Sequence, residues 1–183
     1  MEINKSDVIE KAAAIISNSG IEFLNIPNLA KALGVDKSKL NNQLTHDDDI
    51  LLLLLLNFES EVKDLVDDFS TQQINPELEL KLLFKKIYAL FLNKPYYLSI
   101  IFDKNLIKRK NNVKLAIIRI KNSAGNYLTT LINKGKMQHT FQSKVPTRLI
   151  VSKLLTEFRL LMKDEQRVNE MILELKTIKT FKD

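Results

Sequence analysis

The sequence has no cysteine among its 183 residues and only two histidines, His46 and His139. Without cysteine the chain forms no disulfide, no zinc site with thiolate ligands and no iron–sulfur cluster. Two histidines far apart in the sequence also exclude a metal site built from several histidines of one chain. Glycine and proline are scarce, at four residues each, which argues against collagen-like, linker-rich and all-β chains. The composition favours a globular protein in a reducing compartment.

The sequence also lacks an apolar run long enough to cross a membrane. The strongest run, residues 50–56, has seven residues, whereas a membrane-spanning helix needs about 20. Residues 80–102 are apolar over a sufficient length, but several lysines interrupt them. The first residues carry acids and do not resemble a signal peptide. We therefore expect a soluble cytoplasmic protein with no membrane partner.

No set of residues typical of an enzyme is present. The sequence contains no glycine-rich phosphate loop and no hydrolase motif. A ferritin-like metal site would need Glu-x-x-His pairs, but Gln43 and Lys136 stand three residues before the two histidines. The sequence thus predicts neither catalysis nor a cofactor.

Charge is distributed unevenly along the chain. The formal net charge is +6, but residues 1–70 carry −7, from six lysines and thirteen acids, so residues 71–183 carry +13. Net charge informs about partners rather than fold, and the positive second part hints at an anionic or amphipathic ligand. Five basic residues gather in residues 104–114. They are interpreted either as a solvated loop, which the pattern favours, or as a second contact with nucleic acid.

Nearly every segment has the apolar spacing of an amphipathic helix, and no strand is predicted. Ser6 and Asn25 are expected to cap the first two helices, and Gly20 and Gly34 to end them. We predict an all-α fold of about nine helices. A three-helix helix-turn-helix domain over residues 1–46 precedes a C-terminal helical bundle over residues 47–183. The predicted helices cover residues 6–19, 26–33, 37–44, 48–69, 76–93, 96–103, 113–134, 147–162 and 165–181.

The second and third helices have the spacing of a helix-turn-helix, whose second member enters the DNA major groove. A tight turn at Gly34 joins them, and the third helix has an acid-free polar surface. Lysine suits phosphates and guanine, and asparagine and glutamine suit the adenine edge. The pattern alone is equally compatible with an ordinary solvated helix. The candidate DNA contacts are Asn25, Asn28, Lys37, Ser38, Lys39, Asn41, Asn42, Gln43 and His46.

Residues 5–55 resemble the N-terminal domain of the TetR family of bacterial transcriptional repressors. The resemblance rests on the stretch Leu29-Ala30-Lys31-Ala32-Leu33-Gly34-Val35-Asp36-Lys37-Ser38-Lys39-Leu40. It is similar to the family core Ile-Ala-x-x-Ala-Gly-Val-Ser-x-x-x-Leu. The resemblance implies a DNA-binding regulator whose C-terminal domain binds a small-molecule effector. It also implies that the last two helices form a four-helix bundle in a homodimer.

Three positions depart from the family pattern. Asn41 and Leu44 replace its Tyr and Phe, and Asp47 stands where the family often has a lysine that contacts phosphate. The acids at 47–49 suit the positive end of the following helix, although a cation is an alternative ligand for them. Acids beside a DNA backbone weaken binding, because phosphate attraction dominates affinity. A ligand-binding or protein-binding helical dimer that has lost DNA binding therefore stays open as the alternative function.

The C-terminal part supplies candidates for two further sites. Aromatic side chains between helices are a usual lining for a small-molecule pocket, although plain core packing explains the same spacing. The effector candidates are Phe84, Tyr88, Phe102, Tyr127 and Phe158. Two apolar stripes on the last helices suit a two-fold interface, with packing inside one chain as the alternative. The interface candidates are Leu154, Phe158, Leu161, Val168, Ile172 and Leu175.

Overall fold

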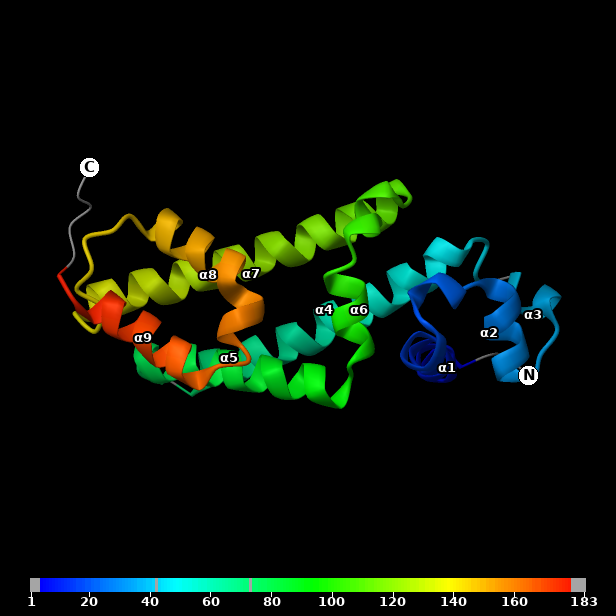
Figure 1. The fold of residues 1–183 in the computed structure, drawn as a ribbon, viewed down its shortest axis with the longest axis horizontal. Helices are drawn as coiled ribbons and strands as arrows, with labels where there is room; N and C mark the ends of the chain where they lie inside the picture. The colour runs from blue at the N-terminus through cyan, green and yellow to red at the C-terminus, as the bar shows by residue number, and fades with distance from the viewer. Residues whose placement is uncertain (1–3, 42, 73, 179–183) are drawn as a thin grey trace. The chain divides into compact units, whose positions relative to one another are not determined.

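The structure is a computed structural model that describes residues 4–41, 43–72 and 74–178. Over these residues the chain forms nine α-helices and two short 3-10 helices and no strand, which confirms the predicted all-α fold. None of the helices in these ranges is long and apolar enough to cross a membrane. In chain order the helices are α1 (Lys5–Ser19), η1 (Ile21–Phe23), α2 (Ile26–Leu33), α3 (Lys37–Asn41), α4 (Asp47–Thr71), α5 (Pro76–Asn93), α6 (Tyr96–Ile101), η2 (Lys104–Lys108), α7 (Asn111–Met137), α8 (Thr147–Leu161) and α9 (Glu165–Lys176), and Figure 1 labels the α-helices.

The chain divides into two compact units, and neither is a continuous stretch of sequence. The first unit combines Met1–Glu61 with Phe91–Arg119, and the second combines Val62–Leu90 with Ile120–Asp183. Helices α4, α5 and α7 therefore each contribute to both units. The division into domains after residue 46 stays a prediction.

Local signals at the start of the chain place the first helices. Asn25 accepts a hydrogen bond from the Asn28 N–H at 2.9 Å and so caps α2, as predicted. Gly34, with φ of 66°, ends α2 in the left-handed region, where a residue without Cβ is favoured. The predicted cap of the first helix was wrong: Asn4 caps α1 by accepting from the Ser6 N–H at 3.0 Å, so Ser6 lies inside the helix.

Helix α3 is shorter than predicted, because it ends at Asn41 instead of residue 44. The N–H groups of Gln43 and Leu44 both donate to the Leu40 carbonyl, at 2.9 and 2.8 Å, which closes the helix in a turn. Leu40 and Leu44 are both buried. The chain therefore turns where it can bury both leucines, and the next helix follows at once.

Other helix boundaries also differ from the prediction. Helix α7 begins two residues earlier and continues to Met137, so Gly135 lies within it rather than in a loop. A 3-10 helix, η2, forms in the basic stretch that was predicted to be non-helical. Helix α9 ends at Lys176 instead of residue 181. Residues 179–181 of that prediction lie outside the described residues.

Each of the two units has an apolar core. In the first unit, one face of α4 is fully buried, but Leu56 on its other face is 39% exposed. The first core consists mainly of Val8, Ala12, Ile16, Leu29, Ala30, Leu40, Ile50, Leu51, Leu54, Leu55 and Phe58, and the second of Leu80, Leu83, Phe84, Ile87, Leu128, Leu131, Ile132, Phe141, Ile150, Leu154, Leu161, Val168, Ile172 and Leu175.

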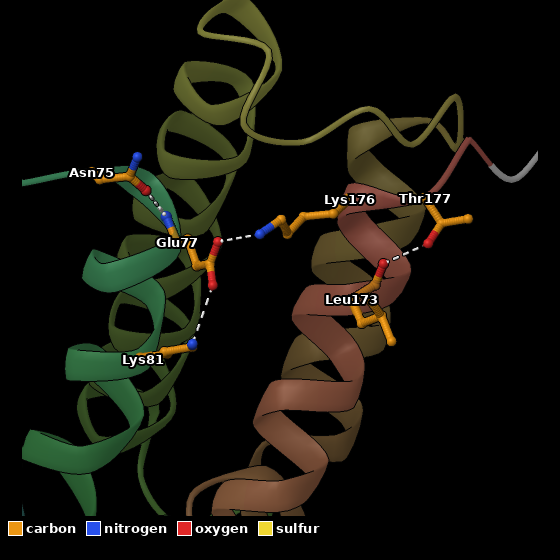
Figure 2. A network of polar contacts seen from close by, with 6 residues as sticks. All are labelled: Asn75, Glu77, Lys81, Leu173, Lys176 and Thr177. Carbon is orange, nitrogen blue, oxygen red and sulfur yellow. Dashed lines mark hydrogen bonds and ion pairs between the residues drawn. The ribbon is translucent and has the colours of Figure 1, made fainter.

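Polar contacts hold α9 in place within the second unit. Glu77, at the start of α5, bonds to Lys176 of α9 at 2.8 Å and to Lys81 at 3.1 Å (Figure 2). The last turn of α9 also accepts hydrogen bonds from a loop, because the N–H groups of Gln142 and Ser143 both donate to the Leu175 carbonyl at 2.9 Å. The C-terminal end of α9 is thus tied to α5 and to the loop before α8.

Candidate nucleic-acid interface

Helix α3 presents the acid-free polar surface that the sequence predicts. Lys37, Ser38 and Lys39 are exposed, while Leu40 is fully buried and anchors the helix to the core. The turn before α3 is fixed by the Val35 N–H, which donates to the Ala30 carbonyl at 3.1 Å. A short helix held in this way projects its polar side chains from a rigid base, as DNA reading requires.

The structure describes only some of the remaining predicted DNA contacts at the end of α3. Gln43 is exposed in the turn that follows the helix. The backbone of Asn41 closes α3, but its side chain lies outside the described part of the chain, as does the whole of Asn42. The structure therefore places Lys37, Ser38, Lys39 and Gln43 on α3 and the turn that follows it, in the N-terminal helix-turn-helix part of the chain, which we call the head.

Asn25 and Asn28, at the start of α2, already have structural partners. The Asn25 side chain caps α2, and the Asn28 side-chain amide donates to the Phe23 carbonyl at 2.9 Å. These bonds fix the entry to α2. Each side chain can contact DNA only through polar groups that do not take part in these bonds.

The turn between α3 and α4 is built on Asp49. Its Oδ2 accepts from the backbone N–H groups of Thr45 and His46, both at 2.8 Å, and from the Thr45 hydroxyl at 2.9 Å. Burial by itself raises the pKa of this carboxyl, but the three donors and the charge of Lys110 together outweigh that effect, so the pKa of Asp49 lies below its usual value. The His46 side chain is exposed at this turn, where the sequence placed a phosphate contact.

The other two acids serve the starts of other helices. Asp47 Oδ1 accepts from the Ile26 N–H of α2 at 2.7 Å. Asp48 is buried, and its Oδ1 meets Arg109 Nη1 at 3.3 Å while its Oδ2 accepts from the Lys110 N–H at 2.8 Å. Sequence reasoning missed Arg109 and Lys110 as partners, because they are separated from Asp48 by about sixty residues and no local pattern connects them.

The three acids bond to segments other than α3. Asp47, Asp48 and Asp49 bond to the start of α2, to the segment before α7 and to their own turn, and none of these bonds reaches α3. The Arg109 guanidinium is paired with the one buried carboxylate among them. Within the described residues, the hydrogen bonds of the three acids thus lead away from α3, although Asp36 directly precedes that helix and is exposed.

The predicted effector residues do not form one cluster. Phe84 is buried and packs on Phe158, with ring centroids 5.4 Å apart, in the second unit. Phe102 belongs to the first unit, where its ring lies 6.4 Å from that of Phe91. Tyr88 is half-buried in the second unit. The structure brings Phe84 and Phe158 together and places Phe102 in a different unit.

Tyr127 joins a buried polar cluster that sequence reasoning missed. Its hydroxyl donates to Glu79 Oε1 at 2.8 Å, and Lys134 Nζ bonds to Glu79 Oε2 at 2.9 Å and to the Ile74 carbonyl at 3.1 Å. Burial, followed by the hydrogen bond to Glu79, raises the pKa of Tyr127 far above its usual value. Glu79 is only 5% exposed, and the Tyr127 hydroxyl and Lys134 supply the hydrogen bonds that its carboxylate would otherwise make to water. No local pattern predicts this burial, because Glu79 is one of two acids in the first turn of α5.

A hollow of about 550 Å³ lies between α8, α9 and the loop before α8. Its lining is mainly apolar and includes Val145, Leu149, Ile150, Met171 and Leu175, with Lys153 and Glu174 at hydrogen-bonding distance from each other. None of the five predicted effector residues lines it. The hollow is a place in this unit, apart from the predicted effector residues, where a small molecule has room.

The side chains of the predicted dimer residues pack within the single chain. Five of the six are at most 4% exposed, namely Leu154, Leu161, Val168, Ile172 and Leu175, and Phe158 is half-buried against Phe84. These residues expose little area in the single chain, and their role in a dimer stays a prediction. The apolar side chains that α8 and α9 leave exposed are Leu149, Leu155, Leu160 and Leu173. A partner on these helices would contact that second set.

The sequence matches no protein-family model and no curated protein. Solved structures match over almost the whole chain. A TetR family transcriptional regulator from Agrobacterium tumefaciens superposes with a TM-score of 0.80 at 11% identity, covering 94% of this chain and 97% of that one. The regulator FadR from Bacillus subtilis, solved with stearoyl-CoA, gives 0.74 at 16% identity, covering 95% and 98%. AibR, solved with isovaleryl coenzyme A and operator DNA, gives 0.73 at 13% identity, covering 95% and 99%.

The TM-scores of these neighbours establish a shared architecture although the identities are low, and each superposition covers at least 94% of this chain. The chain has the fold of the TetR family of transcriptional regulators.

Proposed function

We propose that this protein is a DNA-binding transcriptional regulator, acting as a repressor, that reads its operator with α3. The observation that carries the proposal is the exposed, acid-free surface of Lys37, Ser38 and Lys39 on a helix anchored by buried Leu40. The fold supports it, since neighbours with this fold include a regulator solved with operator DNA. The proposal assigns the protein no catalytic step and a cytoplasmic location.

The second unit is proposed to bind a small molecule that controls operator affinity. Two structural neighbours were solved with acyl thioesters of coenzyme A, so this class is the first to test. The positive charge of residues 71–183 suits such an anionic, amphipathic molecule. Control of this kind requires that the ligand bind the two arrangements of the reading heads with different affinity.

The repressor is proposed to act as a homodimer through α8 and α9. The exposed leucines of these helices would meet their counterparts in a second copy around a two-fold axis. Two reading heads would then contact half-sites about 34 Å apart, one helical turn of DNA, or a multiple of that spacing. The operator is therefore expected to be a palindrome.

A helical dimer that has lost DNA binding is the second candidate. The observation that favours it is the charge of −7 on residues 1–70. The folded arrangement weakens this argument, because Phe91–Arg119 belongs to the same unit as the head. That unit then contains twelve basic and eleven acidic residues, a formal charge of +1.

Selection of bound fragments from sheared genomic DNA separates the two candidates. The full-length protein is expected to retain a small set of fragments that share a palindrome. K37A/K39A should bind those fragments at least about ten-fold more weakly, since each specific base contact contributes about 1–3 kcal/mol. K85A/K163A is the matched control, because it removes two exposed lysines of the second unit and should bind like the wild type. Retention of no fragment at all by the wild-type protein would leave only the second candidate.

A further inference from the structure

Three helix starts meet at the beginning of α4 in the first unit. Asp47 bonds to the first residue of α2, Ile26, at 2.7 Å, and the next residue, Asp48, bonds to the N–H of Lys110 at 2.8 Å. Lys110 directly precedes α7, and its carbonyl accepts from the Val113 and Lys114 N–H groups at 3.1 and 3.2 Å. The chain before α7 is therefore held beside the turn that connects the reading helix α3 to α4.

The segment held there is strongly basic. We call residues 104–110 the junction segment. It contains Lys104, Lys108, Arg109 and Lys110 and no acid. The three lysine side chains are exposed, and no acceptor among the described residues takes a hydrogen bond from their ammonium groups. Arg109 is used differently, because its guanidinium lies 3.3 Å from the buried Asp48 carboxylate.

The junction segment compensates the acids that the sequence places at the start of α4. Asp47, Asp48 and Asp49 carry a formal charge of −3. The four cations of the segment, together with the capping acid Asp103, carry +3. A phosphate approaching this end of the unit therefore meets a neutral region with exposed lysines instead of an isolated acidic cluster. The acids are engaged with N–H donors and Arg109, and the charge of Lys110 also attracts Asp49, whereas all three lysine side chains are exposed.

We propose that the junction segment is a second contact surface for the DNA phosphate backbone, beside the major groove that α3 occupies. This proposal rests on the proposed DNA-binding function. Lysine is a flexible point charge that attracts phosphate without a fixed geometry, and such attraction acts over about 10 Å at 0.1 M salt. The contact adds affinity without reading sequence, because phosphates carry no base information.

The test compares two triple variants of the full-length protein that carry the same net charge. K104Q/K108Q/K110Q removes the three lysine charges of the junction segment and keeps the ion pair between Arg109 and Asp48. K85Q/K144Q/K163Q removes three exposed lysines of the second unit. The probes are a duplex selected by the wild-type protein and a scrambled duplex of equal length, each titrated from about 50 to 200 mM salt. Thermal melting of both variants verifies that they fold.

The proposal expects a reduction of affinity that is equal for both duplexes. K104Q/K108Q/K110Q should bind each at least about ten-fold more weakly than the control variant at the lowest salt. Its salt slope should also be smaller by about one for each phosphate that the variant no longer neutralises. K104R/K108R/K110R, which keeps the charges, should bind like the wild type.

Three results would overturn it. If the wild type binds its duplex but both glutamine variants have the same affinity and salt slope, the junction segment does not contact DNA, and the proposed function survives. A reduction confined to the selected duplex would show base reading instead of phosphate contact. If the wild type binds neither duplex, the proposed function fails and this inference fails with it.

Discussion

Single residues in this structure show that a side chain's neighbours in space decide its role. Asp47, Asp48 and Asp49 are adjacent in sequence, yet they accept hydrogen bonds from three different segments. The sequence interpretation treated them as one acidic cluster that complements a helix start and repels DNA. Their pairing with Ile26 and Lys110 was invisible from the sequence, because partners so distant follow no helical spacing.

Gly135 is the residue at which packing overrides helix propensity. It lies inside α7, where alanine is ordinarily more favourable by about 1 kcal/mol, but a Cβ there would overlap the ring of buried Phe141. Gly135→Ala should therefore lower the free energy of unfolding by about 1–3 kcal/mol, the usual cost of overpacking. Urea denaturation measures this change.

The matched control is Gly125→Ala in the same helix. A Cβ at Gly125 would meet its nearest neighbour, Leu155, at 3.8 Å, an ordinary contact. This variant should be as stable as the wild type or up to about 1 kcal/mol more stable. Equal stability of the two variants would contradict the close packing of Phe141 on α7.

Glu77 makes the stability of the second unit sensitive to acid. Its hydrogen bonds to Lys176 and then Lys81 hold the pKa of this carboxyl below the ordinary value of 4.5 (Figure 2). A carboxyl whose pKa is lower in the folded state than in the unfolded state stabilises the fold at pH values above its unfolded-state pKa. That stabilisation disappears as the pH falls through the folded-state pKa. The free energy of unfolding should thus decrease as the pH falls below about 4.5.

Glu77→Gln should flatten that dependence, because a neutral amide does not titrate. The comparison is the difference in unfolding free energy between about pH 7 and pH 3 for wild type and variant. Glu165→Gln, which removes an exposed carboxylate with no ion pair among the described residues, should keep the wild-type dependence. An equal pH dependence in wild type and Glu77→Gln would contradict the assigned pairing.

At the scale of elements, both ends of α2 were predicted correctly, whereas the residue that caps α1 was not. Asn25 and Gly34 place both ends of α2, since capping and positive φ are local properties. The end of α3 was wrong, because burial of Leu44 against the core, and not helix spacing, decides it. The faces of α8 and α9 were also hard to assign, because an apolar stripe serves an intrachain core and a dimer equally well.

The exposed leucines of α8 and α9 make the dimer proposal testable. L160E/L173E places two charges on side chains that are 53% and 65% exposed. A dimer formed through these helices should dissociate, because burying unpaired charge in an apolar interface is costly. Sedimentation velocity measures the oligomeric state, and the variant should sediment as a folded monomer.

L115E/I118E is the matched control, since these side chains of α7 in the first unit are exposed to a similar degree, 54% and 52%. It should remain dimeric. Dissociation by the control and not by L160E/L173E would place the interface on α7 instead.

At the scale of the whole molecule, folding redistributes the charge that the sequence separates. The first 70 residues carry −7, but the unit that contains the reading helix also includes Phe91–Arg119 and has a charge of +1. The acidic character that argued against DNA binding therefore belongs to the linear sequence and not to the folded unit. The chain shares its architecture with the regulators FadR and AibR.

The most direct measurement is a titration of the full-length protein against its selected duplex and a scrambled duplex at one salt concentration near 0.15 M. A regulator that reads sequence through α3 should prefer the selected duplex by at least about 1,000-fold, the lower end of typical specificity ratios. K37A/K39A should reduce that ratio, while K85A/K163A should not. Equal affinity of the wild-type protein for both duplexes would show that α3 reads no sequence.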